Sequence, residues 1–178
     1  MILTPREALM VIRERRRVKS MSVRREPDQM LSSQLKHARL AIGLSRAAAS
    51  RLLGVTKNSL SRWEHGSSEP DMLMVSKMCS AYFARPSDVL CVPRDGTGEL
   101  RVQDIGSRIM RARSAYGLTR IKLATMSGWG KTTIRGWELD EAVPKPSSCR
   151  ELANAIGVSH EWIMGFSLAT YHVNGIKR

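Results

Sequence analysis

The chain has 178 residues, of which 42% are hydrophobic, and carries a formal net charge of +13 at pH 7. This composition is sufficient for globular domains, but no apolar run of about eighteen residues occurs, so no membrane span is expected. The N-terminus is too charged for a signal peptide, and we therefore expect a soluble cytoplasmic protein.

Positive charge is spread along most of the chain. Residues 1–30, 31–92 and 105–168 each carry +4, whereas residues 93–104 carry −1. Such a spread suits a polyanionic partner over a long footprint. Charge alone permits RNA, but with only 5% aromatic residues the chain lacks the interleaved aromatics of common single-strand RNA readers.

The cysteine and histidine residues show no metal-site pattern. Cys79, Cys91 and Cys149 form no CxxC pair, and the four histidines have no ligand spacing with one another or with cysteine. No nucleophile elbow, phosphate-binding loop or carboxylate pair is recognisable. Cys79 and Cys149 fall in predicted helices, and we expect the three cysteines to be buried free thiols in a reducing compartment. We expect no cofactor, no metal and no enzymatic activity.

Residues 1–30 are predicted to be a basic N-terminal arm with one short helix. Thr4 is a suitable cap and Pro5 a favourable first helical residue, so a helix is expected to about Arg17. Functionally, the arm would follow phosphates or enter a minor groove. The alternative, a solvated tail, is supported equally well by these residues.

Residues 44–64 predict two short helices joined by a tight turn. Ser45 caps the first helix, Gly54 permits the sharp turn, and Thr56 caps the second helix. The residues expected to face the core are Ala48, Ala49, Leu52, Leu53, Leu60 and Trp63. The outer face of the second helix is then polar and basic, which suits entry into a DNA major groove; it comprises Lys57, Asn58, Ser59, Ser61 and Arg62.

The same stretch returns 74 residues later, at residues 118–138. Ser33–Cys91 aligns with Ser107–Gly165 without a gap, and evenly spaced identities include Trp63 with Trp137. We interpret this as a tandem duplication of one small helical domain. The predicted organisation is an arm at 1–30, a first domain at 31–92, a linker at 93–104, a second domain at 105–168 and a tail at 169–178.

Five helices are predicted in each domain. In the first they lie near 31–42, 46–53, 57–65, 71–83 and 86–90, and in the second near 105–116, 120–127, 131–138, 147–156 and 159–164. The fourth helix of the first domain is expected to bury a stripe at helical spacing: Met72, Val75, Met78, Cys79 and Tyr82.

Each copy resembles the Cro and lambda-repressor-like (XRE-type) helix-turn-helix domain, over about two thirds of the chain. The residues that carry the resemblance in the first copy are Arg39, Gly43-Leu44-Ser45, Gly54-Val55-Thr56, Leu60, Trp63-Glu64 and Pro70. Those of the second copy are Arg113, Gly117-Leu118-Thr119, Gly128, Ile134, Trp137-Glu138 and Pro144. The resemblance implies an all-α chain of two tandem five-helix lambda-repressor-like domains.

The resemblance also implies roles for individual residues. Base-reading residues would be Lys57, Asn58, Ser59, Arg62, Lys131, Thr132 and Thr133. Phosphate contacts would come from Arg46, Arg120, Thr56 and Arg135, with arginine at Arg46 and Arg120 where the family usually has glutamine. Structural salt bridges would join Arg39 to Glu64 and Arg113 to Glu138.

The second copy departs from the pattern at three positions. Gly130 replaces the capping Thr56, Gly136 stands where Arg62 would reach bases, and Ser127 takes the place of Leu53. Two hypotheses follow. In one, the second domain is a weaker DNA reader in a covalent pseudo-dimer; in the other, it contacts a protein partner, for which Trp129 is a candidate if it is not part of the core.

The predicted function is a sequence-specific, double-stranded DNA-binding transcription regulator of bacterial or phage type, a repressor, associated with the nucleoid and able to form a homodimer. The alternative is an interaction protein of antitoxin or anti-activator type. A linker of thirteen residues from Val92 to Asp104 spans at most about 43 Å. Since successive half-sites lie roughly 34 Å apart, the linker permits both domains to occupy neighbouring major grooves.

Overall fold

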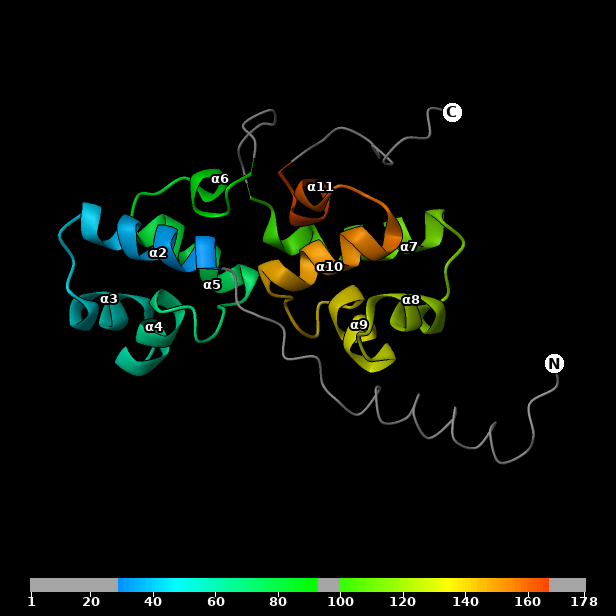
Figure 1. Ribbon diagram of the computed structural model, residues 1–178, viewed down its shortest axis with the longest axis horizontal. Coiled ribbons are helices and arrows are strands. Elements are labelled where there is room, and N and C mark those ends of the chain that lie inside the picture. Colours follow the sequence, from blue (N-terminus) through cyan, green and yellow to red (C-terminus); the bar gives the residue numbers. More distant parts are fainter. Residues whose placement is uncertain (1–28, 93–99, 167–178) are drawn as a thin grey trace, which may run out of the picture.

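The computed structural model describes residues 29–92 and 100–166 (Figure 1). The regular structure of these residues is entirely helical, and two similar groups of helices lie side by side. This confirms the predicted all-α fold with two tandem units. The expected arm helix at 4–17 and the tail at 169–178 lie outside the described residues.

The first unit begins two residues earlier than expected, at Gln29. Three of its helices start at residues whose side chains accept a hydrogen bond from the helix backbone: Ser45, Thr56 and Asp71. The helices are α2 (Gln29–Ala41), α3 (Arg46–Leu53), α4 (Lys57–Glu64), α5 (Met72–Ala81) and α6 (Pro86–Val89).

The second unit repeats this order after a short 3-10 turn. Thr119 and Ser159 cap two of its helices, whereas Gly130 provides no side-chain cap. Its elements are η1 (Val102–Asp104), α7 (Ile105–Ala115), α8 (Arg120–Ser127), α9 (Lys131–Glu138), α10 (Pro146–Ile156) and α11 (His160–Met164). Leu100 and Val102, which fall within the expected linker, pack against the core.

Each unit buries an apolar core between its helices. The predicted stripe of α5 is confirmed, since all five of its side chains are buried. Leu52, by contrast, is 61% exposed, and its assignment to the core is wrong. Because α3 is two turns long and packs through Ala49 and Leu53, four residues apart, Leu52 lies beside the buried face.

A left-handed glycine sets the angle between the two helices of each helix-turn-helix. Gly54 has φ 69° and Gly128 has φ 71°, a conformation that most other residues adopt only with strain. In the first unit the N–H of Val55 donates to the carbonyl of Ser50, which closes the end of α3. The chain then turns directly into the next helix.

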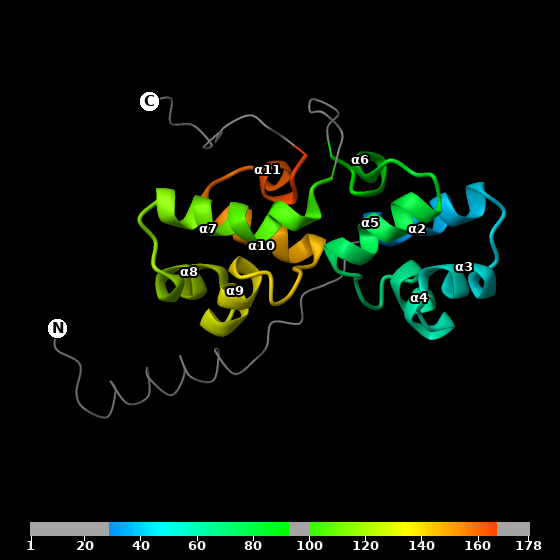
Figure 2. The ribbon, with the colours of Figure 1, turned by 180° about the vertical axis from the view of Figure 1, so that it is seen from behind.

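The front and back views show α4 and α9 along the same edge of the molecule, with α3 and α8 beside them (Figures 1 and 2). The helices α5 and α10 occupy the middle, where the two units meet. Within the described ranges, no helix is long and apolar enough to cross a membrane.

Candidate nucleic-acid interface

The outer face of α4 displays most of the predicted base-reading residues. Lys57, Asn58 and Arg62 are exposed, whereas Ser59 is half-buried. The Oγ1 atom of Thr56 accepts a hydrogen bond from the Ser59 N–H at 3.0 Å and lies 2.8 Å from the Ser59 Oγ. Two of the predicted DNA contacts, Thr56 and Ser59, thus also hold the start of the helix.

The outer face of α9 is built from smaller side chains. Lys131, Thr132 and Thr133 are exposed, and so is Arg135. The Arg135 guanidinium forms an ion pair of 3.1 Å with Glu141, which follows the helix. A predicted phosphate contact of the second unit therefore already has a carboxylate beside it.

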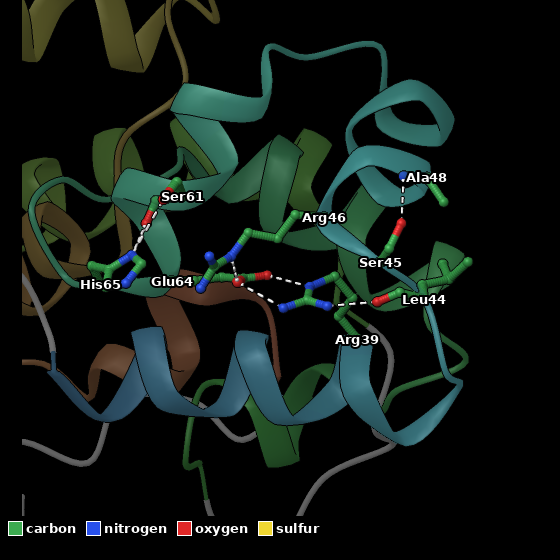
Figure 3. A network of polar contacts seen from close by, with 8 residues as sticks. All are labelled: Arg39, Leu44, Ser45, Arg46, Ala48, Ser61, Glu64 and His65. Carbon is green, nitrogen blue, oxygen red and sulfur yellow. Dashed lines mark hydrogen bonds and ion pairs between the residues drawn. The ribbon is translucent and has the colours of Figure 1, made fainter.

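A buried glutamate holds two arginines together in the first unit (Figure 3). The Arg39 Nε lies 2.5 Å from Glu64 Oε1, and its Nη2 donates to Oε2 at 2.9 Å. The Arg46 Nε donates to the same Oε2 at 2.8 Å. Arg39 also donates to the Leu44 carbonyl at 2.5 Å, which ties α2 to the segment that precedes α3.

This network keeps an ionised carboxylate inside the protein. Burial alone would raise the pKa of Glu64, but the hydrogen bonds from Arg39 and Arg46 outweigh it and hold the pKa below its usual value. The hydrogen bond with Glu64 likewise raises the pKa of Arg39. The three side chains together carry one net positive charge. Arg46 presents that charge to solvent, since its side chain is 32% exposed.

The second unit repeats the network with Glu138 at its centre. The Nε atoms of Arg113 and Arg120 each lie 2.5 Å from one of its carboxylate oxygens. The Arg120 side chain is 33% exposed, close to the value for Arg46. The sequence did not predict the bonds from Arg46 to Glu64 and from Arg120 to Glu138. The same arginine and the same glutamate occur at these positions in both copies, and this repetition was a usable signal.

The two units differ most around Gly136. A Cβ atom built on Gly136 would meet only Glu141 Oε2, at 3.9 Å. The first unit has Arg62 and Ser67 at the corresponding positions. The second unit thus presents a carboxylate where the first presents a guanidinium, and the sequence did not indicate this because Glu141 lies beyond the end of α9.

Trp129 packs inside the second unit. Its ring contacts Trp137 edge-on with 4.9 Å between centroids, and its Nε1–H donates to Glu151 at 2.8 Å. It is half-buried and packed against the core. These contacts brace α9 from behind and favour the structural interpretation of Trp129 over the interface interpretation.

The described thiols are free. Cys79 and Cys149 are buried, and burial raises the pKa of each to about 12, which keeps them protonated. Cys91, by contrast, is exposed, and its expected burial is wrong. Among the residues placed by the structure, no group of three histidine, cysteine, aspartate or glutamate side chains could hold a metal ion.

Two units that each present a short, polar helix after a glycine turn define a helix-turn-helix protein. Comparison with protein families supports this: the helix-turn-helix model matches residues 35–89 and again residues 109–163. The chain belongs to the XRE-type helix-turn-helix family, a family of DNA-binding regulators, and contains two tandem copies of its domain. Searches of curated proteins and of solved structures returned no match.

Proposed function

We propose that this protein is a sequence-specific transcription regulator of bacterial or phage type that reads double-stranded DNA with both α4 and α9 and represses by occluding a promoter. The observation that carries the proposal is the alignment of the two outer helix faces along one edge of the molecule (Figures 1 and 2). We call α4 and α9, each with the helix before it, the first and second heads. Two heads on one edge suit two major grooves on one face of a duplex.

In the first head, Lys57, Asn58 and Arg62 read the bases. They are exposed on the outer face of α4. Lysine and arginine match the O6 and N7 acceptors of guanine, and asparagine matches the N6 and N7 edge of adenine. Ser59 adds a hydroxyl near the start of the helix.

Arg46 and Arg120 grip phosphates on either side of the heads. Each arginine stands at the first position of the helix before its recognition helix, and its Nε is held by a buried glutamate. A guanidinium fixed in this way loses less conformational entropy on binding than a free one. Thr56 contributes a further phosphate contact, and Arg135 contributes one when it leaves its ion pair with Glu141.

The second head reads with Lys131, Thr132 and Thr133. It discriminates fewer bases than the first, because Gly136 has no side chain and Glu141 lies close to that position. The DNA site is therefore expected to be asymmetric, with one strongly specified half and one weakly specified half.

The test is a footprint of the full chain on DNA upstream of its own gene at two salt concentrations. Protection of about two helical turns, weakening steeply with salt, supports regulation through both heads. One protected turn would mean that the first head alone reads DNA. No protection at either salt concentration would move the function to a protein contact.

The sign of regulation needs a separate measurement. A reporter driven by the footprinted promoter, with and without the gene for this protein, should show lower output when the protein is present. The matched control is a Lys57→Ala/Arg62→Ala variant, in which output should return to the level without the protein. Higher output with the native protein would contradict repression.

A further inference from the structure

The two units are joined by direct contacts as well as by the linker. The N–H of Met72 donates to the Pro144 carbonyl at 3.0 Å. The Ser147 Oγ donates to Glu69 Oε2 at 2.5 Å, and the Ser147 N–H approaches the same oxygen at 3.4 Å. Glu69 is only 7% exposed. We call the contact between residues 69–73 and 143–147 the seam; it lies in the middle of Figure 1, at the starts of α5 and α10.

The seam joins equivalent parts of the two copies. With the 74-residue offset of the duplication, Pro144 corresponds to Pro70 and Ser147 corresponds to Leu73. Residues 69–73 therefore meet their own counterparts, as in the interface of a two-fold dimer. An interface of this kind sets one orientation of α4 relative to α9, and the two views agree that both helices face the same side (Figures 1 and 2).

Neither hydrogen bond of the seam is repeated by the equivalent residues of the other copy. The counterpart of Met72 is Pro146, which has no N–H to return a bond. The counterpart of Glu69 is Val143, which has no carboxylate. If two first copies met through this surface, the buried Glu69 would face Leu73 instead of Ser147 and lose its hydroxyl partner. The seam therefore pairs unlike copies within one chain.

Further contacts extend the seam toward the two ends of the linker. Arg150 Nη2 donates to the Leu90 carbonyl at 3.3 Å, which joins α10 to the end of the first unit. Leu100, Arg101 and Gln103, at the start of the second unit, line one hollow together with Ser76 and Ser80 of α5. The contact is therefore made at several points, as rigid coupling requires.

From these contacts we infer that the seam makes the two heads one rigid reader, which fixes both the spacing and the order of the two half-sites in DNA. This inference rests on the proposed function and names what determines site architecture. Two units joined by a flexible linker alone would accept a range of spacings. The seam permits one spacing, and Glu69 and Ser147 are the residues that position the two heads.

A DNA-independent measurement tests the seam itself. The Met72 amide is at the first position of α5, where an amide has no partner within its own helix, so its protection from hydrogen exchange depends on Pro144. In Ser147→Ala this amide should exchange faster, while the Met74 amide, which donates to Asp71 within the first unit, should not change. Ser33→Ala, which removes an exposed hydroxyl from α2, is the control. An unprotected Met72 amide in the native chain would overturn the inference.

The spacing is tested on duplexes selected from a random pool by the full chain. Insertion of about 5 or about 10 base pairs between the half-sites should each lower affinity by about 100-fold or more, because one head is lost in both cases. Exchange of the two half-sites should lower affinity as well. Recovery to within a few fold at 10 base pairs would show independent heads on a flexible linker and overturn the inference while leaving the proposed function intact.

The variants connect the two measurements. Ser147→Ala and Glu69→Ala should reduce the penalty for the 10-base-pair insertion at least about tenfold, with Ser33→Ala unchanged. If Glu69→Ala fails to fold, Ser147→Ala still decides the result. An unchanged penalty in folded Ser147→Ala would overturn the role of the seam. Selection of no duplex at all would overturn the proposed function, and the inference with it.

Discussion

The two copies share their internal framework and differ on their outer faces. Each contains a buried glutamate that binds two arginines, a left-handed glycine at the helix turn, and a tryptophan on the recognition helix. On the outer face, the first copy has Arg62 and a threonine cap, whereas the second has Gly136 and a glycine at the cap position.

This difference separates the residues that the fold requires from the residues that DNA recognition requires. The shared residues contact one another across helices, so that a change in one affects its partners. Of the residues that differ, Arg62 is exposed and available to contact DNA, whereas Gly136 at the equivalent position of the second copy is buried. The carboxylate of Glu141, close to Gly136 and paired with Arg135, makes the second outer face less positive than the first.

The largest expected effect is the removal of a buried carboxylate. Glu64→Ala leaves Arg39, whose side chain is 5% exposed, without its ion-pair partner and should cost about 3–5 kcal/mol in the free energy of unfolding. Glu138→Ala should cost less, because the Arg113 side chain is 13% exposed. Chemical denaturation measures both, and Glu141→Ala, which removes a glutamate that is 52% exposed, is the control. Equal, small losses for Glu64 and Glu138 would contradict the structural role.

The second prediction compares the two reading faces. Lys57→Ala should weaken specific DNA binding by about 1–3 kcal/mol, equivalent to roughly 5- to 150-fold. Lys131→Ala should weaken it less, since the second head is the weaker reader. Lys77→Ala, which removes an exposed lysine from α5, is the control for charge alone. A gel-shift titration at fixed salt measures the three variants, and a larger loss for Lys131→Ala would reverse the assignment of the heads.

A third prediction concerns the glycine in α9. Gly136→Ala should stabilise the second unit by up to about 1 kcal/mol, because its Cβ meets only Glu141, at an ordinary contact distance. Gly106→Ala is the opposite case, since its Cβ would lie 2.2 Å from the Trp137 carbonyl oxygen. This substitution should destabilise the second unit by about 1–3 kcal/mol. Thermal unfolding distinguishes them. Destabilisation by Gly136→Ala would show a backbone requirement that the contacts do not reveal.

A fourth prediction concerns the release of Arg135 from its ion pair with Glu141. Glu141→Gln should raise DNA affinity a few fold and steepen the salt dependence by about 0.9 in log–log slope, because one more arginine becomes available for phosphate. Stability should change by less than about 1 kcal/mol, since the pair is exposed. Asp140→Asn, which removes an equal charge one residue away, is the control. An unchanged slope would mean that Arg135 does not reach DNA.

The smallest effect is expected from the pH dependence of Glu64. Its folded-state pKa is held below the usual 4.5 by Arg39 and Arg46, so the ionised form contributes stability that is fully present above pH 4.5. That contribution is lost as the pH falls through the folded pKa. Unfolding free energies measured from pH 6 downward should therefore fall more steeply for the native chain than for Glu64→Gln. Parallel curves of unfolding free energy against pH for the two proteins would contradict the lowered pKa of Glu64.

Much of the fold could be predicted because its signals are local. The caps at Ser45 and Thr56 and the turn at Gly54 each depend on a few neighbouring residues, and the stripe of α5 depends on helical periodicity. The helix ranges predicted from these signals lie within two residues of those in the structure. Leu52 was misassigned because periodicity alone does not show how wide the buried face of a short helix is.

The candidate site was only partly predictable. The exposed residues of α4 and α9 followed from the helix pattern, whereas the second partner of each buried glutamate did not. Glu141 was also missed, since a residue beyond a helix end has no periodicity to place it. These contacts depend on the path of the chain after a turn, which short-range patterns do not specify.

The sequence by itself determined two copies of a helix-turn-helix domain, their helices and their basic character, because repetition, capping and apolar spacing are readable one residue after another. Only the tertiary structure decided how the copies meet. Glu69 and Ser147 are 78 residues apart, and their contact requires both helix starts to be folded and correctly oriented. A hydrogen bond across that separation follows from three-dimensional packing, which no local pattern in the chain encodes.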